Sequence, residues 1–160
     1  MKAASVHQIK QELEALSSAE TRELLMRLAR FRVENKEMLS YLIFYSEDEA
    51  GFVKTIKADI DILFSEINLT HPYYIRKSVR RVLRLIYKYI RFSGSRHTEA
   101  ELLLFFCSKL VSTGILGLQH TAITNVFSNQ LNKVRKALTH LHDDLRHDYE
   151  EEIRALLKRM

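Results

Sequence analysis

The chain has 160 residues, of which 46% are hydrophobic and 28% are charged, and its formal net charge at pH 7 is +5. These are the proportions of a folded globular protein, and the length favours a single helical domain over residues 1–160. With four Gly and one Pro, the chain has too few turn residues for an all-β sandwich or barrel. Its single Cys excludes a disulfide scaffold within one chain.

Apolar residues recur at helical spacing along almost the whole chain, starting near the N-terminus. Ser5 with Gln8, and Ser17 with Glu20, have the spacing of capping boxes, so we expect a helix after each serine. The apolar pattern continues through residues 38–43, after a break near 34–35. Ser46 and the acidic residues at 47–49 then predict the start of a helix whose apolar face runs from 52 to 67.

Residues 68–72 form the clearest break in the helical pattern. Pro72 suits the first position of a helix, and the spacing predicts a long helix over 72–92 that ends at residues 93–95. Thr98 with Glu101 predicts a third capping box before an apolar helix through 102–111. After a glycine-containing loop at 114–117, residues 120–158 are expected to be helical, with a kink near Asn129 or His147.

These elements predict an all-α fold of seven to eight helices in stacked antiparallel hairpins. Periodicity leaves open whether they form an irregular bundle or a short HEAT-like solenoid. The longest apolar run, residues 102–107, is too short to cross a bilayer, which predicts no membrane contact. The first residues lack the apolar core of a signal peptide, and together with the lone Cys this predicts a cytoplasmic protein.

Four segments, residues 16–31, 34–44, 91–95 and 142–145, resemble a group of small uncharacterised all-helical bacterial proteins. The resemblance extends over most of the chain. It implies a stand-alone helical domain, and it brings with it no known activity and no catalytic residue.

The positive charge is concentrated in one segment. Residues 1–66 hold nine basic and twelve acidic side chains, residues 67–98 hold eight basic and no acidic ones, and residues 99–160 hold eight of each. On a helix the seven cations between 76 and 91 fall within an arc of about 140°. This arc lies opposite an apolar stripe formed by Ile75, Val79, Val82, Leu83, Ile86 and Ile90. We define the basic face as these seven residues with the one that follows: Arg76, Lys77, Arg80, Arg81, Arg84, Lys88, Arg91 and Arg96.

This face has two interpretations. It is an ordinary solvated surface, partly neutralised by acids such as Asp59, Asp61 and Glu66, or it binds an external anionic surface. On the second interpretation the chain is a non-catalytic protein–protein interaction module that contacts an acidic protein surface. Binding of nucleic-acid backbone is the alternative, and a second copy of the chain is a further partner.

Three other features are candidates for a binding or catalytic site. The turn at residues 93–98 leads to a helix N-terminus that attracts anions, or it is a plain turn with a cap. A metal site is compatible with the helical spacing of His140, Asp144 and His147. The better interpretation is that these side chains are exposed to solvent and bind no metal. Cys107 lies in an apolar segment typical of an inert core thiol. We therefore predict no catalytic residue, no metal site and no cofactor.

Overall fold

The computed structural model describes residues 2–118 and 121–160. Over these residues the chain folds into eight α-helices and one short 3-10 helix, without a strand, which confirms the all-α prediction. The chain divides into a first unit that ends at Phe44 and a second unit from Tyr45 to Met160. The single domain expected over residues 1–160 stays a prediction.

The first unit contains α1 (Val6–Glu14), α2 (Ser18–Phe31) and α3 (Val33–Phe44). Both predicted capping boxes are present: Ser5 and Ser17 accept hydrogen bonds from the backbone N–H groups of Gln8 and Glu20, whose side chains accept in return. The break between α2 and α3 lies at Arg32, just before the expected 34–35.

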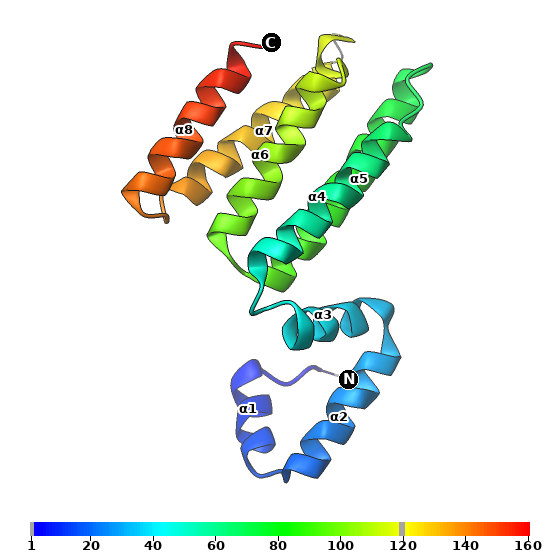
Figure 1. Cartoon of the computed structure of the whole chain (residues 1–160). Coiled ribbons are helices and arrows are strands. Elements are labelled where there is room, and N and C mark those ends of the chain that lie inside the picture. The colour runs from blue at the N-terminus through cyan, green and yellow to red at the C-terminus, as the bar shows by residue number, and fades with distance from the viewer. Residues whose placement is uncertain (1, 119–120) are drawn as a thin grey trace. The chain divides into compact units, whose positions relative to one another are not determined.

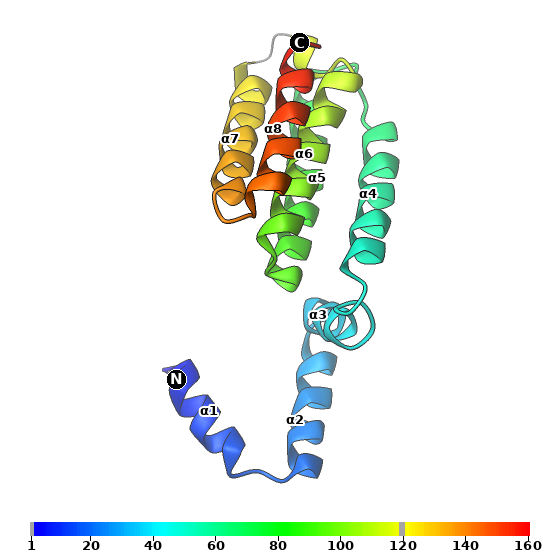
Figure 2. The same ribbon diagram turned by 60° about the vertical axis from the view of Figure 1, so that its left-hand side comes forward.

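The second unit contains α4 (Glu49–Ser65), α5 (Pro72–Ser93), α6 (Arg96–Ser112), the 3-10 helix Leu116–Leu118, α7 (Thr121–Leu138) and α8 (Asp143–Leu157). Figures 1 and 2 show α6 with α4 and α5 on one side and α7 and α8 on the other, and α6 packs against all four. Its buried residues lie on most sides of the helix, as expected of a central helix. The second unit is therefore a helical bundle around α6.

Two predictions of local structure are wrong. The cap of α6 is Ser95, whose side chain accepts from the backbone N–H of Thr98, so the third capping box predicted at Thr98 and Glu101 does not form. The helix predicted over 120–158 is broken at 139–142, because backbone turns end α7 at Leu138 and α8 begins at Asp143. The expected start at His120 lies outside the described residues.

No helix in the part of the chain that the structure describes has both the length and the apolar content needed to cross a membrane.

A candidate anion-binding surface on helix α5

Local sequence determines where α5 begins and ends. Pro72 occupies the first helical position, and the Nδ1 atom of His71 accepts from the backbone N–H of Tyr73 at 3.1 Å. Gly94 ends the helix with a φ of 66°, in the left-handed region where a side chain would be strained. One face of α5 packs into the bundle and holds the buried residues Ile75, Val79, Val82, Ile86 and Phe92.

The predicted cations of α5 lie on the opposite side of the helix. Six of them are exposed and Lys88 is half-buried. Within residues 2–118 and 121–160, no ion pair is formed by Arg76, Lys77, Arg80, Arg81 or Arg84. The eighth predicted cation, Arg96, begins α6 instead and pairs with Glu99 at 2.6 Å.

Of the three acids of α4, Asp61 and Glu49 contact residues outside α4, and Asp59 lines the groove described below. Asp61 pairs with Lys109 of α6 at 2.5 Å. Glu49 accepts hydrogen bonds from the hydroxyl groups of Ser93 and Thr98. Among the described residues, Arg76, Lys77, Arg80, Arg81 and Arg84 thus form no ion pair that neutralises them within the fold, although Asp59 lies near Arg81 and Arg84 in the groove.

A groove of about 430 Å³ lies between α4 and α5. Its apolar surface comes from Ile62, Leu63 and Leu85. Charged residues from the two helices also line it, with Asp59 on α4 and Arg81, Arg84 and Lys88 on α5. The Nζ atom of Lys88 also lies 4.6 Å from the ring centroid of Tyr89. The α4/α5 groove therefore combines apolar surface with an excess of positive charge.

A cation on α7 lies beside the basic face. Lys133 Nζ donates to the Tyr87 hydroxyl oxygen at 2.7 Å and lies 4.4 Å from the centroid of its ring. Tyr87 in turn donates to the side-chain oxygen of Gln130, which is buried. Lys133 was not among the predicted cations, although residues 102–142 contain four basic and no acidic side chains, and this local excess of positive charge indicates a second basic segment.

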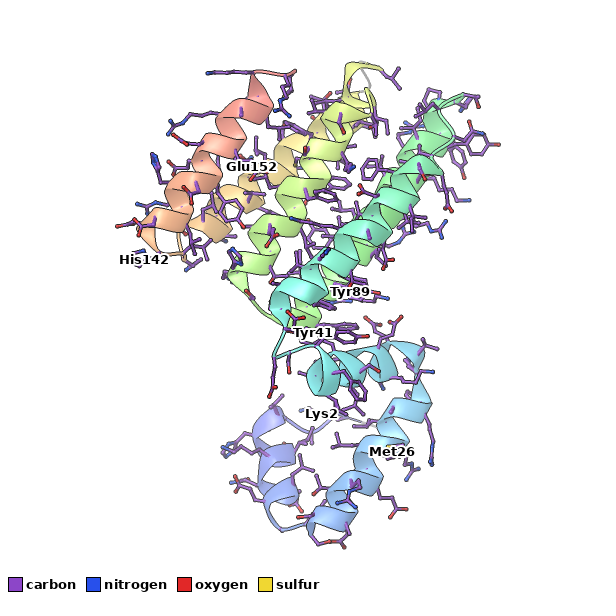
Figure 3. All side chains as sticks on the ribbon, in the orientation of Figure 1. Lys2, Met26, Tyr41, Tyr89, His142 and Glu152 are labelled. Atoms are coloured by element: carbon purple, nitrogen blue, oxygen red, sulfur yellow. The ribbon has the colours of Figure 1, made fainter. Side chains whose placement is uncertain are left out.

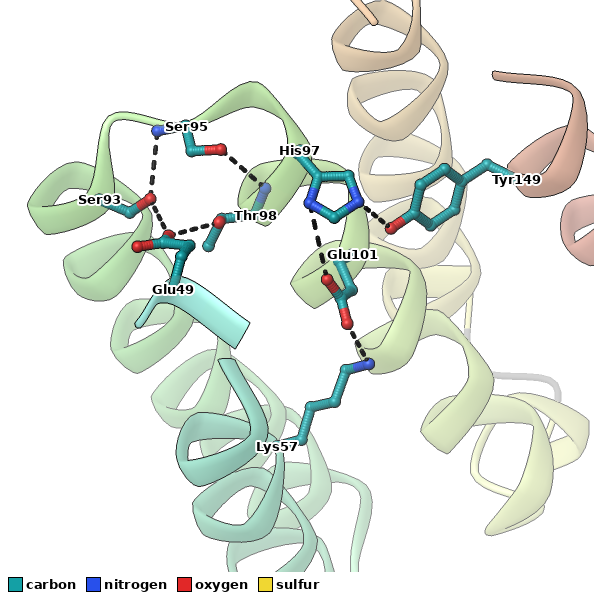
Figure 4. Close-up of polar contacts among 8 residues, drawn as sticks. All are labelled: Glu49, Lys57, Ser93, Ser95, His97, Thr98, Glu101 and Tyr149. Atoms are coloured by element: carbon teal, nitrogen blue, oxygen red, sulfur yellow. Dashed lines mark hydrogen bonds and ion pairs between the residues drawn. The ribbon is translucent and has the colours of Figure 1, made fainter. Parts of the chain in front are cut away.

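The polar side chains of the turn at residues 93–98 belong to a hydrogen-bonded cluster at the start of α6 (Figure 4). Ser95 caps α6, and the carboxylate of Glu49 accepts from Ser93 and, at 2.5 Å, from Thr98. The anion at this turn is therefore the side chain of Glu49. The hydrogen bonds join α4 to the α5–α6 turn, which supports the interpretation as a turn with a cap.

The same cluster continues to α8. Lys57 pairs with Glu101 at 2.7 Å, and His97 lies between Glu101, at 3.9 Å, and the hydroxyl of Tyr149, at 3.0 Å. Burial raises the pKa of Tyr149 above its ordinary value, and the nearby carboxylates of Glu101 and Glu152 raise it further. Through these contacts, Lys57 of α4, His97 and Glu101 of α6, and Tyr149 of α8 are joined.

The remaining candidates have ordinary structural surroundings. Cys107 is fully buried in α6, and burial raises its pKa to about 12, which disfavours the reactive thiolate. His140 lies in the turn that separates α7 from α8, so it does not share a helix with Asp144 and His147 as the spacing had suggested. In the described part of the chain, no three His, Cys, Asp or Glu side chains are placed to hold a metal ion.

Comparisons with protein-family models, with curated proteins and with solved structures found no match for this chain.

Proposed function

We propose that this protein is a non-catalytic interaction module whose α4/α5 groove and adjoining cations bind an acidic, amphipathic segment of a partner protein. The observation that carries the proposal is the placement, beside apolar groove residues, of cations that form no ion pair with any residue the structure describes. Arg81 and Arg84 line the groove together with Ile62, Leu63 and Leu85. A cytoplasmic location is part of the same proposal.

The apolar and basic residues of the groove indicate which kind of partner would bind there. An amphipathic helix that docks in a groove places its apolar residues against apolar walls. Ile62 is 57% exposed and is available for such contact. Carboxylates along the edge of the same helix would meet Arg81 and Arg84, and guanidinium groups can bind carboxylates through two parallel hydrogen bonds. Charge and apolar surface together thus favour an acidic protein segment.

Binding of nucleic-acid backbone is the alternative, and a different part of the basic face favours it. Arg76, Lys77 and Arg80 are exposed and unpaired among the described residues, and they do not line the groove. Residues 76–91 span about 22 Å along the helix, which is enough to follow several phosphates of one strand. Phosphate binding would use this row of cations and would not need Ile62 or Leu85.

The test uses a fluorescein-labelled peptide of about 20 residues, with leucines on one helical face and glutamates on the other. A peptide of the same composition in scrambled order and a single-stranded oligonucleotide are the comparison probes. We expect the amphipathic peptide to bind most tightly. Arg81→Glu with Arg84→Glu should weaken its binding by a factor of about 10 or more.

Two variants separate the candidates. Lys54 is exposed on α4 outside the groove, so Lys54→Glu is the matched charge control and should leave peptide binding unchanged. Ile62→Ser should weaken peptide binding without affecting the oligonucleotide. Binding of the oligonucleotide alone, weakened by Arg76→Glu with Arg80→Glu and unaffected by Ile62→Ser, would contradict the proposal in favour of the alternative.

A further inference from the structure

The first unit leaves the apolar faces of its helices uncovered. Among residues 2–44 only Tyr41 is buried. Met26, labelled on α2 in Figure 3, is 45% exposed. Thirteen large apolar side chains of this unit are at least 41% exposed: Val6, Ile9, Leu13, Leu24, Leu25, Met26, Leu28, Phe31, Val33, Met38, Leu42, Ile43 and Phe44. A unit of this size with almost no core needs an additional stabilising contact.

Ten of these thirteen side chains line two grooves. The larger, about 550 Å³, lies between α1 and α2, and its lining is apolar except for Thr21 and Arg27. The smaller, about 390 Å³, lies between α2 and α3 and has apolar walls bordered by Arg30, Arg32 and Lys36. Within the unit, α2 packs against α3, and Asn35 Nδ2 donates a hydrogen bond of 2.9 Å to the Leu28 carbonyl.

We propose that a second copy of this chain covers this surface, so that the protein self-associates through residues 2–44. The available area fits this role. Full burial of one large apolar side chain removes on the order of 100 Å² from water, so the thirteen side chains present on the order of 700 Å² of apolar surface. A standard interface buries roughly 800 Å² per partner, of which about 60% is apolar. The uncovered surface is therefore sufficient for a stable dimer.

The charges of the first unit favour a second copy as the occupant. Residues 1–44 hold seven basic and six acidic side chains, so two copies can approach without strong repulsion. The cations Arg30 and Lys36 border the α2/α3 groove, and Glu12 flanks the apolar stripe of α1. None of these three groups has an ion-pair partner among the described residues of its own copy. In a two-fold interface, α1 of each copy would bring Glu12 to the basic groove of the other.

The first test is the mass of the full chain by sedimentation velocity from about 1 to 100 μM, a range that covers moderate dimer affinities. We expect twice the 18.8 kDa of one chain at the upper end. Leu28→Glu with Phe31→Glu should give a monomer. Leu69→Glu with Leu145→Glu, which alters exposed apolar residues of the second unit, should remain a dimer. Circular dichroism of each variant verifies that the second unit stays folded.

A monomeric wild-type chain over the whole range would overturn the proposal. Slow amide hydrogen exchange in residues 2–44 of such a monomer would indicate that other residues of the same chain cover the apolar surface. Fast exchange would indicate that the surface is exposed to solvent. Equal loss of the dimer in both double variants would also overturn it.

A charge exchange provides the second test. Glu12→Arg and Arg30→Glu should each weaken the homodimer, whereas an equimolar mixture of the two variants should restore dimers, since each copy then meets an opposite charge. The arrangement would be contradicted if both single variants dimerised as tightly as the wild type. It would also be contradicted if the mixture of the two variants stayed monomeric.

Discussion

Lys133 on α7 donates a hydrogen bond to the hydroxyl of Tyr87 on α5, with 2.7 Å between the nitrogen and the oxygen. The same hydroxyl donates to the buried side chain of Gln130. Tyr87 therefore connects the helix that carries the basic face with α7, and it satisfies the amide oxygen of Gln130. The position of the cations on α5 is in this way coupled to the packing of the bundle.

Tyr87→Phe should lower the free energy of unfolding by about 1–2 kcal/mol, because the Gln130 oxygen loses its donor in a buried position. Urea denaturation measures the change. Tyr73→Phe removes a hydroxyl from a side chain that is 54% exposed, and it should stay within about 0.5 kcal/mol of the wild type. Equal effects of the two variants would contradict the role assigned to Tyr87.

Glu49→Ala should lower the free energy of unfolding by about 1–3 kcal/mol, because the fully buried hydroxyl of Thr98 loses its acceptor. The Ser93 hydroxyl loses the same carboxylate. Glu47 is exposed in the turn before α4, so Glu47→Ala is the matched control and should have little effect. A stability of Glu49→Ala indistinguishable from that control would show that the contacts across the α5–α6 turn contribute little.

Because the thiol of Cys107 is buried, we predict that the free energy of unfolding falls at alkaline pH. Burial raises the pKa of its thiol from 9.0 to about 12 in the folded chain, so between these values the unfolded chain has released a proton that the native chain retains. The unfolded state then binds fewer protons, and the free energy of unfolding falls by up to about 1.4 kcal/mol per pH unit. Below pH 9 this contribution to stability is fully present.

Urea denaturation at several pH values between 9 and 12 tests this dependence. Cys107→Ala should be less stable at neutral pH, because it leaves a small cavity, but its stability should decline less steeply above pH 9. Tyr149 is retained in both proteins, so its own alkaline titration cancels in the comparison. Parallel curves for the two proteins would contradict a buried, protonated thiol.

The parts of the fold that depend on neighbouring residues were predictable from the sequence. The capping boxes at Ser5 and Ser17 are contacts over three residues, and Pro72 and Gly94 mark the ends of α5 by their backbone preferences alone. At residues 95–101 two overlapping cap patterns compete. Because Ser95 caps the helix, the Thr98 hydroxyl is free to donate a hydrogen bond to Glu49. These two residues are 49 positions apart, so local spacing does not indicate this contact.

Long-range packing accounts for the other differences. Apolar spacing continues through Leu141 and Leu145, yet the chain turns at 139–142 and Leu145 is 43% exposed. Helical period predicted which side of α5 carries the cations, but not that Lys133 lies beside Tyr87, since that depends on how α7 packs. The apolar faces of α1 to α3 likewise indicated surfaces to be buried without indicating what buries them.

The most direct test of the proposed function is to locate the bound peptide. The ¹⁵N-labelled full chain is titrated with the amphipathic acidic peptide, and the amide chemical shifts are followed by NMR. We predict that the largest changes occur at residues 59–63 and 81–88, which include all seven residues that line the α4/α5 groove. Changes confined to residues 2–44, or no change at saturating peptide, would contradict the assignment of this groove as the binding site.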